Sequence, residues 1–172
     1  MTSQTGTEDL AHHPAVNRVR EALRGLQAQG EVVVLDDHVR TAAQAAEKLG
    51  VTVGQIANSL IFAVPDESAP DDHRAVLVLT SGAHRVDTDH VAALLEVPRL
   101  DRATPEFVRE RTGFVIGGVA PVGHIQPVQT LVDVALATYD QVWAAAGHPR
   151  TVFPTRYDEL LRITAGQPVE VD

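Results

Sequence analysis

The strongest candidate for chemistry is a glycine-rich segment, TGFVIGGVAPVGH, at residues 112–124. Glycine tolerates positive φ and lets a ligand approach the main chain closely, and Pro121 stiffens the turn. Backbone N–H groups held in such a loop can point at an anion or at a developing oxyanion. Glycines in strands also mark bends with close packing. Spacing alone therefore leaves a functional loop and a structural bend as alternatives.

Two phosphate-binding motifs are excluded at this segment. No Gly-Lys-Ser/Thr follows it, so it is not a Walker loop. No Gly-x-Gly-x-x-Gly opens a helix after a strand, so it is not a dinucleotide fingerprint. Lys48 is the only lysine in the chain, so a catalytic lysine would have to be that residue.

The histidines do not predict a metal site. The chain has eight of them, but His73, His84 and His90 show no familiar ligand spacing. There is no cysteine, which excludes thiolate sites, disulfides and a cysteine nucleophile. His124 differs because it leaves the glycine-rich segment. It could orient a substrate or transfer a proton near neutral pH, or simply bond to the backbone.

Two further sets of residues are weaker candidates. Ser59 or Ser81 could form a hydrolase triad with His124 and Asp133, but the chain lacks a Gly-x-Ser-x-Gly elbow. The most basic stretch could contact phosphate, although a solvated helix face explains it equally well. Its four arginines are Arg99, Arg102, Arg109 and Arg111.

Hydrophobic periodicity predicts mixed α/β structure around these residues. Thr41 is expected to cap a helix that ends at Gly50, and the helix that begins at Pro14 is expected to end at Gly30. Two apolar runs around a polar loop predict a buried hairpin. The expected helices cover 14–29, 42–49, 88–95, 105–112 and 158–163, with a short turn at 53–57. The expected strands cover 31–35, 60–64, 75–79, 131–137, 141–146 and 151–154.

Size and charge narrow the class of protein. The chain has 172 residues, with 44% apolar and 22% charged residues, which suits one globular domain. Its formal net charge of −9 argues against a nonspecific nucleic-acid coat. No apolar run approaches the ~20 residues of a membrane helix, and residues 1–9 do not form a signal peptide. We expect a flexible tail at 1–13, one folded domain at 14–172 and a cytoplasmic location.

Several segments of the chain resemble a known family. The features that carry the resemblance are QIANSLIF at 55–62, TGF at 112–114, GGVAPVGH at 117–124 and LLRIT at 160–164. Together they are similar to the YbaK/EbsC family, which includes the prolyl-tRNA synthetase editing domain and free-standing deacylases. The resemblance spans roughly residues 16–169. It implies an α/β fold with a mixed, barrel-like sheet wrapped by helices, and hydrolysis of the ester joining a wrong amino acid to tRNA.

The resemblance also implies site residues and partners. Backbone amides of Gly117, Gly118, Val119 and Ala120 would contact the carbonyl and the oxyanion, with Asn58 in the same catalytic group. The substrate would be bound by Ile56, Ser59, Leu60, Phe62, Pro121 and His124. No metal or cofactor is implied. The partner would be a tRNA acceptor end carrying a wrong amino acid, delivered by a synthetase or an elongation factor. A Cβ at Gly118 is expected to crowd the carbonyl site without unfolding the protein.

Position 58 departs from the family pattern, which usually has a lysine there. Asn58 keeps hydrogen-bonding groups but loses the charge. Lys48, on the expected second helix, is not placed to replace it. Three interpretations follow: a variant deacylase that uses Asn58, a non-catalytic binder of aminoacyl-tRNA or a small ligand, or an enzyme that hydrolyses another aminoacyl ester.

Overall fold

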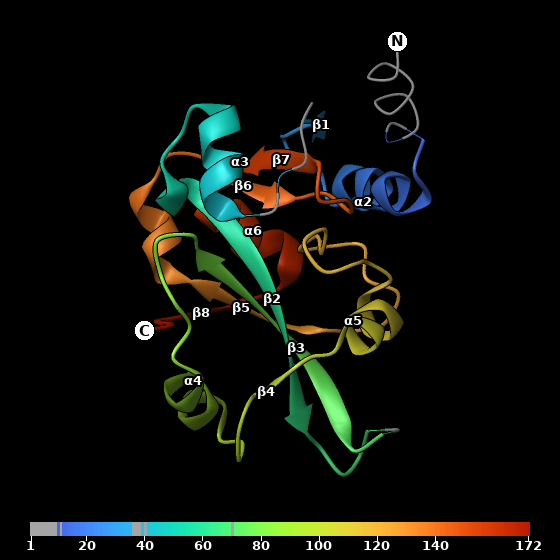
Figure 1. Cartoon of the computed structure of the whole chain (residues 1–172), viewed down its shortest axis with the longest axis vertical. Helices are drawn as coiled ribbons and strands as arrows, with labels where there is room; N and C mark the ends of the chain where they lie inside the picture. The colour runs from blue at the N-terminus through green and yellow to red at the C-terminus, as the bar shows by residue number, and fades with distance from the viewer. Residues whose placement is uncertain (1–9, 11, 36–38, 40, 70) are drawn as a thin grey trace.

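The long strand pair β2 (Ile56–Pro65) and β3 (His73–Ser81) forms the centre of the sheet in this computed structural model (Figure 1). The structure describes residues 10, 12–35, 39, 41–69 and 71–172. The two strands pair antiparallel from Ala57 opposite Ser81 to Pro65 opposite His73. This pairing confirms the predicted hairpin, and both strands extend beyond the apolar runs that predicted them.

The strands in the described part of the chain form one mixed sheet. Its order is β1-β7-β6-β2-β3-β5-β8, and β4 pairs with β2 beside this path. The remaining strands are β1 (Val33–Val34), β4 (Asp101–Arg102), β5 (Gln129–Asp133), β6 (Val142–Ala145), β7 (Thr151–Thr155) and β8 (Gln167–Val169). β1 and β8 lie at opposite ends of the order and do not pair with each other. The mixed sheet is therefore confirmed, but it is open rather than a closed barrel.

Helices cover both faces of this sheet. They are α2 (Pro14–Gly25), α3 (Ala42–Leu49), α4 (Thr88–Leu95), α5 (Pro105–Thr112) and α6 (Tyr157–Thr164). Alternation along β3 sends Leu77 and Leu79 into a core shared with α2, α5 and α6, while Val76 and Val78 enter a core shared with α4. Because both faces are buried, β3 is a continuous apolar run.

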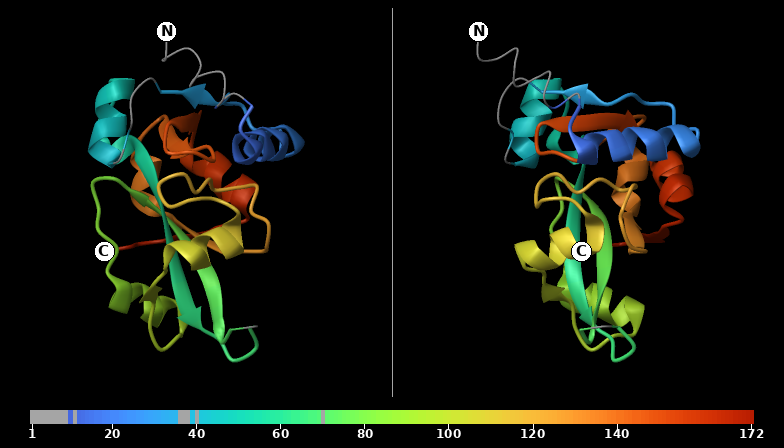
Figure 2. Two further views of the ribbon diagram at one scale, coloured as in Figure 1. Left: turned by 45° about the vertical axis from the view of Figure 1, so that its right-hand side comes forward. Right: turned by 90° about the vertical axis from the view of Figure 1, so that its right-hand side faces the viewer.

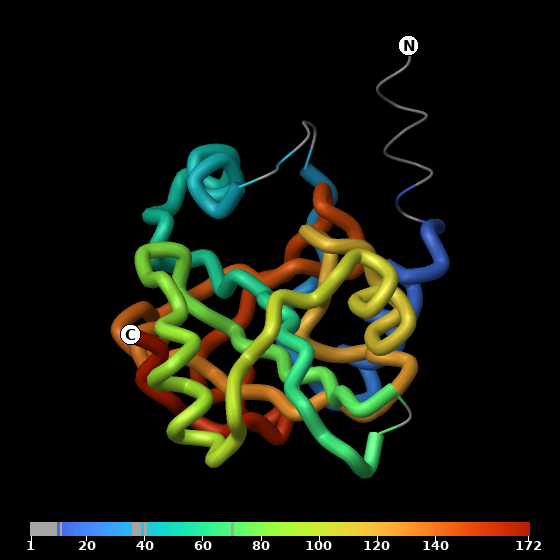
Figure 3. The backbone as a smooth tube through the Cα atoms, turned by 60° about the horizontal axis from the view of Figure 1, so that its bottom comes forward, coloured from blue at the N-terminus to red at the C-terminus, as the bar shows by residue number. Residues whose placement is uncertain are grey.

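Views from other sides show the same arrangement. In Figure 2 the glycine-rich loop, drawn in gold, runs between α5 and the β6–β7 strand pair. Figure 3 shows α3 and α5 on different sides of the β2–β3 hairpin. None of the helices in the described ranges has the length and apolar character needed to cross a lipid bilayer.

Local signals placed most helix ends correctly. Thr41 accepts a hydrogen bond from the Gln44 amide at 3.1 Å, and Gly50 ends α3 with φ +69°. The predicted stop at Gly30 was wrong, because α2 ends at Gly25. Gly30 has a packing role instead: a Cβ there would lie 2.0 Å from the Pro154 carbonyl oxygen.

The predicted strand 131–137 was only half right. β5 ends at Asp133, and a 3₁₀ helix, η2 (Val134–Thr138), follows it. The Asp133 carboxylate accepts a hydrogen bond from the Ala135 amide at 2.9 Å, which starts this helix. A second 3₁₀ turn, η1 (Val53–Gln55), leads into β2, as expected for the predicted turn at 53–57.

Candidate functional site

A gap in one edge of β2 creates the candidate site. On that edge β2 pairs with β6 at Ile56–Ala57 and with β4 at Phe62–Ala63, so residues 58–61 have no strand beside them. The Gly82 amide donates to the Ile56 carbonyl, so the main chain of Ile56 faces β3. In an antiparallel pair the main-chain groups of successive residues face alternate edges, so the even-numbered residues of β2 bond to β3 and the odd-numbered ones face the other edge. The N–H and C=O groups of Ser59 and Ile61 therefore face the open edge. A ligand can reach main-chain donors and acceptors there.

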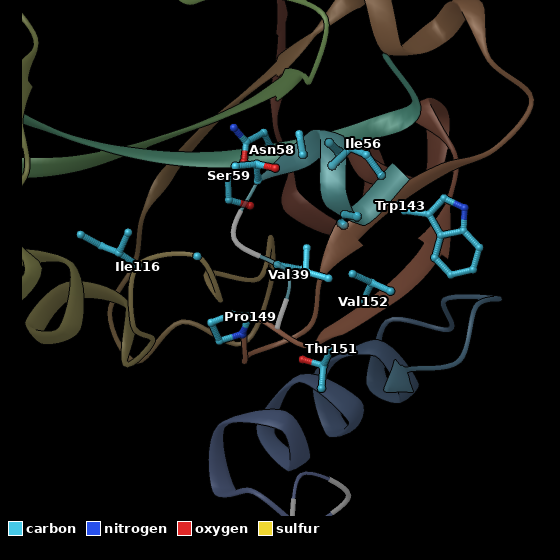
Figure 4. A pocket seen from close by; sticks show the side chains of 16 residues that line it. Val39, Ile56, Asn58, Ser59, Ile116, Trp143, Pro149, Thr151 and Val152 are labelled. Carbon is cyan, nitrogen blue, oxygen red and sulfur yellow. The ribbon is translucent and has the colours of Figure 1, made fainter. Parts of the chain in front are cut away.

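The first pocket opens at this gap and has a volume of about 280 Å³. We call it the Trp143 pocket. Figure 4 shows Asn58 and Ser59 on one side of it, Pro149 and Thr151 on the other, and Ile116 and Trp143 at its two ends. The lining is Val39, Thr41, Ala42, Ala45, Ile56, Ala57, Asn58, Ser59, Ile116, Gly117, Trp143, Ala144, Ala145, Pro149, Thr151 and Val152. None of these described residues is charged.

A second pocket of about 530 Å³ lies on the other side of the gap. We call it the Arg102 pocket. Its lining is Ser59, Leu60, Ile61, Phe62, Thr88, Leu100, Arg102, Ala103, Val108, Ile116, Gly117 and Val119. Three residues, Ser59, Ile116 and Gly117, line both pockets. We call these three the junction. A single extended ligand can occupy both pockets only by passing it.

The glycine-rich loop reaches the junction through Gly117. Gly117 has φ +89° and is exposed. Its amide makes no hydrogen bond to another described residue, whereas the Gly118 amide donates to the Val115 carbonyl at 3.0 Å. A Cβ on Gly118 would lie 2.8–2.9 Å from the main chain of His148. Gly118 is thus a packing position, which contradicts the expectation that alanine there would spare the fold.

Two buried polar atoms around the site lack partners among the described residues. The Ser59 hydroxyl is one, and Trp143 Nε1 is the other. A buried donor or acceptor without a partner costs about 1–3 kcal/mol, so a bound ligand that supplies one recovers that cost. Asn58 is exposed, and its amide makes no side-chain hydrogen bond within the described ranges. At Asn58 and Ser59 the pocket therefore offers two polar side chains that its own neighbours do not satisfy.

The structure brings some predicted site residues together and separates others. Ile56, Asn58, Ser59 and Gly117 line the Trp143 pocket, and Leu60, Phe62 and Val119 line the Arg102 pocket. Gly118 and Ala120 are buried and line neither. Pro121 and His124 line a different pocket beside α6, of about 410 Å³. Their predicted contact with substrate has no support from this placement.

His124 fastens the loop instead. Its Nε2 donates to the Ala120 carbonyl at 2.7 Å, and its ring meets Phe114 edge to face. Arg18 donates to the carbonyls of Gly123 and Gly113 at 2.8 and 3.0 Å, which holds the same turn from α2. Burial lowers the pKa of His124; the hydrogen bond to Ala120 opposes this, and the Arg18 charge adds to the lowering. His124 is therefore neutral at pH 7.

This lowered pKa predicts a loss of stability in acid. Below the ordinary histidine pKa of about 6.5 the unfolded chain binds a proton that the folded chain resists. The free energy of unfolding should therefore fall as the pH drops from 7 to 5. His124→Gln, which keeps a donor for Ala120, should remove that part of the fall, as measured by urea unfolding at each pH. His12→Gln, at an exposed position, is the control. An unchanged pH dependence in His124→Gln would contradict the assignment.

The serine-hydrolase triad considered from the sequence is not assembled. Asp133 is buried and accepts from the Ser81 amide at 2.9 Å, and the histidine that it contacts is His84, through Nδ1 at 3.0 Å, not His124. The Ser81 hydroxyl donates to the Gly54 carbonyl at 2.8 Å. The described residues contain no group of three or more His, Cys, Asp or Glu that could hold a metal ion.

Sequence reasoning missed Ile116, Trp143, Thr151 and Thr88, and it named Arg102 only as one of four arginines that could contact phosphate. Ile116, Trp143 and Thr151 line the Trp143 pocket, and Thr88 and Arg102 line the Arg102 pocket. They come from five separate segments that meet only in three dimensions. Trp143 carried one signal, since it is the only tryptophan in the chain. Arg102 belonged to the basic stretch, which gave no indication of which arginine faces a pocket.

Comparison with solved structures gives close matches over the whole fold. A proposed trans-editing enzyme for prolyl tRNA synthetase is 41% identical, with a TM-score of 0.82 over 92% of this chain and 97% of that one. The hypothetical protein APE2540 is 25% identical, with a TM-score of 0.78 over 90% of this chain and 98% of that one.

Curated relatives point the same way. The uncharacterized protein YwhH of Bacillus subtilis (strain 168) is 26% identical over 146 residues, which are 85% of this chain and 88% of YwhH. The proline–tRNA ligase of Bacillus licheniformis is 32% identical over 77% of this chain, but the match spans only 22% of that enzyme. A model of the aminoacyl-tRNA editing domain matches residues 36–163, most of the chain. The resemblance seen in the sequence is thus confirmed, and the chain belongs to the aminoacyl-tRNA editing domain family.

Proposed function

We propose that this protein hydrolyses the ester bond of mischarged aminoacyl-tRNA as a trans-acting editing enzyme. One observation carries the proposal: the junction joins a small uncharged pocket to a larger one, and two of its residues, Ser59 and Gly117, have a hydroxyl and an amide without a hydrogen-bond partner among the described residues. An aminoacyl ester has the same division, with a small side chain on one side of the carbonyl and a nucleoside on the other. Family membership supports the same substrate class.

The Trp143 pocket suits the amino acid. At about 280 Å³ it lies below the usual range of small-molecule pockets, and an uncharged lining accepts a small apolar side chain. Pocket size can discriminate between amino acids because one methylene is worth about 1–3 kcal/mol. Ser59 and Asn58 offer oxygen acceptors to the α-amino group of the substrate. The ester carbonyl then lies at the junction.

Hydrolysis at the junction needs little from side chains, because an aminoacyl ester is already activated. The Gly117 amide is the proposed oxyanion donor, since it lies at the junction without a hydrogen-bond partner among the described residues. Val119, two residues further along the loop, lines the Arg102 pocket. The two linings contain no described histidine or carboxylate. The attacking water is therefore activated by the substrate's own ribose hydroxyl, and the proposal requires no metal.

A panel of mischarged tRNAs tests the proposal. Purified protein should release at least one amino acid well above the uncatalysed rate, measured as loss of radiolabelled aminoacyl-tRNA. Equilibrium binding of the same panel identifies the second candidate function. Tight binding without any release would establish a non-catalytic module, an outcome that asparagine in place of the usual family lysine at position 58 favours. A synthetase or elongation factor is the expected source of the tRNA, and adding either should raise the rate.

Asn58 should matter for activity but not for stability. Asn58→Ala removes an exposed amide from the Trp143 pocket, so we expect kcat/KM to fall about tenfold, the effect of one lost hydrogen bond to a charged group. The melting temperature should stay within 1–2 °C, since exposed substitutions change stability by about 0.5 kcal/mol. Asn58→Lys tests whether the usual family residue raises or widens activity. An unchanged rate in Asn58→Ala would remove this residue from the site.

A further inference from the structure

One charge stands out among the residues that line the two joined pockets. The described lining residues comprise apolar, hydroxyl, amide and indole side chains, and Arg102 is their only charged member. The chain as a whole has a formal net charge of −9. A lone cation at an apolar pocket of an acidic protein marks the place where an anionic ligand group is attracted.

The position of Arg102 follows from the short strand β4. Arg102 lies opposite Phe62 on the same edge of β2 that carries the gap at residues 58–61. Paired residues project to the same side of a sheet, so Arg102 shares the side of Phe62. Asp101, the other residue of β4, binds Arg99 at 2.9 Å. The Asp101 carboxylate is thus paired with Arg99, and Arg102 lies beside the pocket.

Arg102 also has no competing partner within the described ranges. It is exposed and makes no hydrogen bond or ion pair there. Its neighbour in sequence Arg99 is paired with Asp101, and Arg111 binds Asp71 and the His73 carbonyl. Of the two remaining arginines in this basic stretch, Arg109 lines neither pocket. The five N–H donors of the Arg102 guanidinium are free for a ligand, and their fork geometry matches phosphate.

We propose that Arg102 binds a backbone phosphate of the tRNA acceptor end and supplies from β4 the positive charge that position 58 lacks. This inference rests on the proposed function. With the amino acid in the Trp143 pocket and the ester at the junction, the nucleoside side of the substrate enters the Arg102 pocket. Leu60, Phe62 and Ile116 offer apolar surface for a base there. The phosphates follow the nucleoside toward the exposed guanidinium.

The decisive experiment compares two substrates, of which only one carries backbone phosphates. One is aminoacyl-adenosine, which has none, and the other is the same aminoacyl group on a CCA trinucleotide. Both carry the amino acid released fastest in the deacylation panel. Arg102→Gln should raise KM for the trinucleotide about tenfold or more with kcat little changed, and should leave both constants for aminoacyl-adenosine unchanged. The slope of log KM against log salt should also decrease by about 0.7, the value for one single-strand phosphate contact.

Arg109→Gln is the matched control, because it removes the same charge from an exposed position of α5 outside both linings. Arg109→Gln should leave KM and kcat unchanged for both substrates. Equal losses on both substrates in Arg102→Gln, or no loss on either, would overturn the phosphate assignment while leaving the proposed function intact. If the wild-type protein hydrolyses nothing, non-hydrolysable 3′-amides of alanine on the same two carriers replace the substrates in a binding assay. A loss of affinity confined to the trinucleotide then supports Arg102, and any other pattern rejects it.

Discussion

Gly118→Ala should abolish deacylation and lower the melting temperature. The new Cβ would lie 2.8 Å from the Cα of His148 and 2.9 Å from its N and C atoms. All three are main-chain atoms, so no side-chain rotation relieves the overlap, and the loop must move away from the turn before β7. Overpacking of this kind costs about 1–3 kcal/mol. For a domain of this size that corresponds to a fall of several degrees.

The effect on activity should exceed the effect on stability. Gly117, the proposed oxyanion donor, is the adjacent residue, and a displacement of about 1 Å at a reacting centre can cost about a hundredfold in rate. Deacylation by Gly118→Ala should therefore fall at least that far at a temperature where circular dichroism shows the fold intact. Gly25→Ala is the control, since a Cβ there meets no atom within 4 Å. A Gly118→Ala protein with normal melting and normal turnover would show that the loop tolerates movement and that Gly117 has no catalytic role.

The central hairpin and the helix caps could be predicted because their causes are local. Thr41 and Thr104 each precede a helix and accept a hydrogen bond from its third residue, a pattern visible in a few adjacent letters. The apolar runs of β2 and β3 are likewise contiguous. β4 and β8 have two and three residues and exist only because longer strands beside them offer free edges. No local pattern distinguishes such segments from loop.

The predicted site residues that line the two pockets come from β2 and from two positions of the glycine-rich loop, Gly117 and Val119. Ile56, Asn58 and Ser59 were identified as one segment, and the structure places all three at the Trp143 pocket. Their individual roles stay predictions. The sequence predicts one common binding role for the glycine-rich loop, but its residues lie in different surroundings. Gly117 is part of the junction, Gly118 packs on His148, and His124 lies at another pocket. The surroundings of each loop residue depend on which other segment packs against it, so they could not be predicted from the composition of the loop alone.

Ser59 should give the clearest separation of function from stability. Its hydroxyl is buried without a partner among the described residues, so Ser59→Ala removes an unsatisfied polar group while keeping the size of the side chain. The free energy of unfolding should stay equal or rise by about 1 kcal/mol. The value of kcat/KM should fall about tenfold, because the substrate loses the hydrogen bond that this hydroxyl provides.

A larger side chain at position 59 should prevent the ester of the substrate from binding at the junction. Ser59→Val adds branched methyl groups at the junction shared by both pockets. Valine is well accommodated in a strand, so the fold should persist while deacylation falls by about a hundredfold or more. Urea unfolding and single-turnover deacylation of both variants measure the two quantities separately. If Ser59→Ala lowered stability, the hydroxyl would have a structural partner. If Ser59→Val kept full activity, the ester would not pass the junction, and the two pockets could not belong to one substrate.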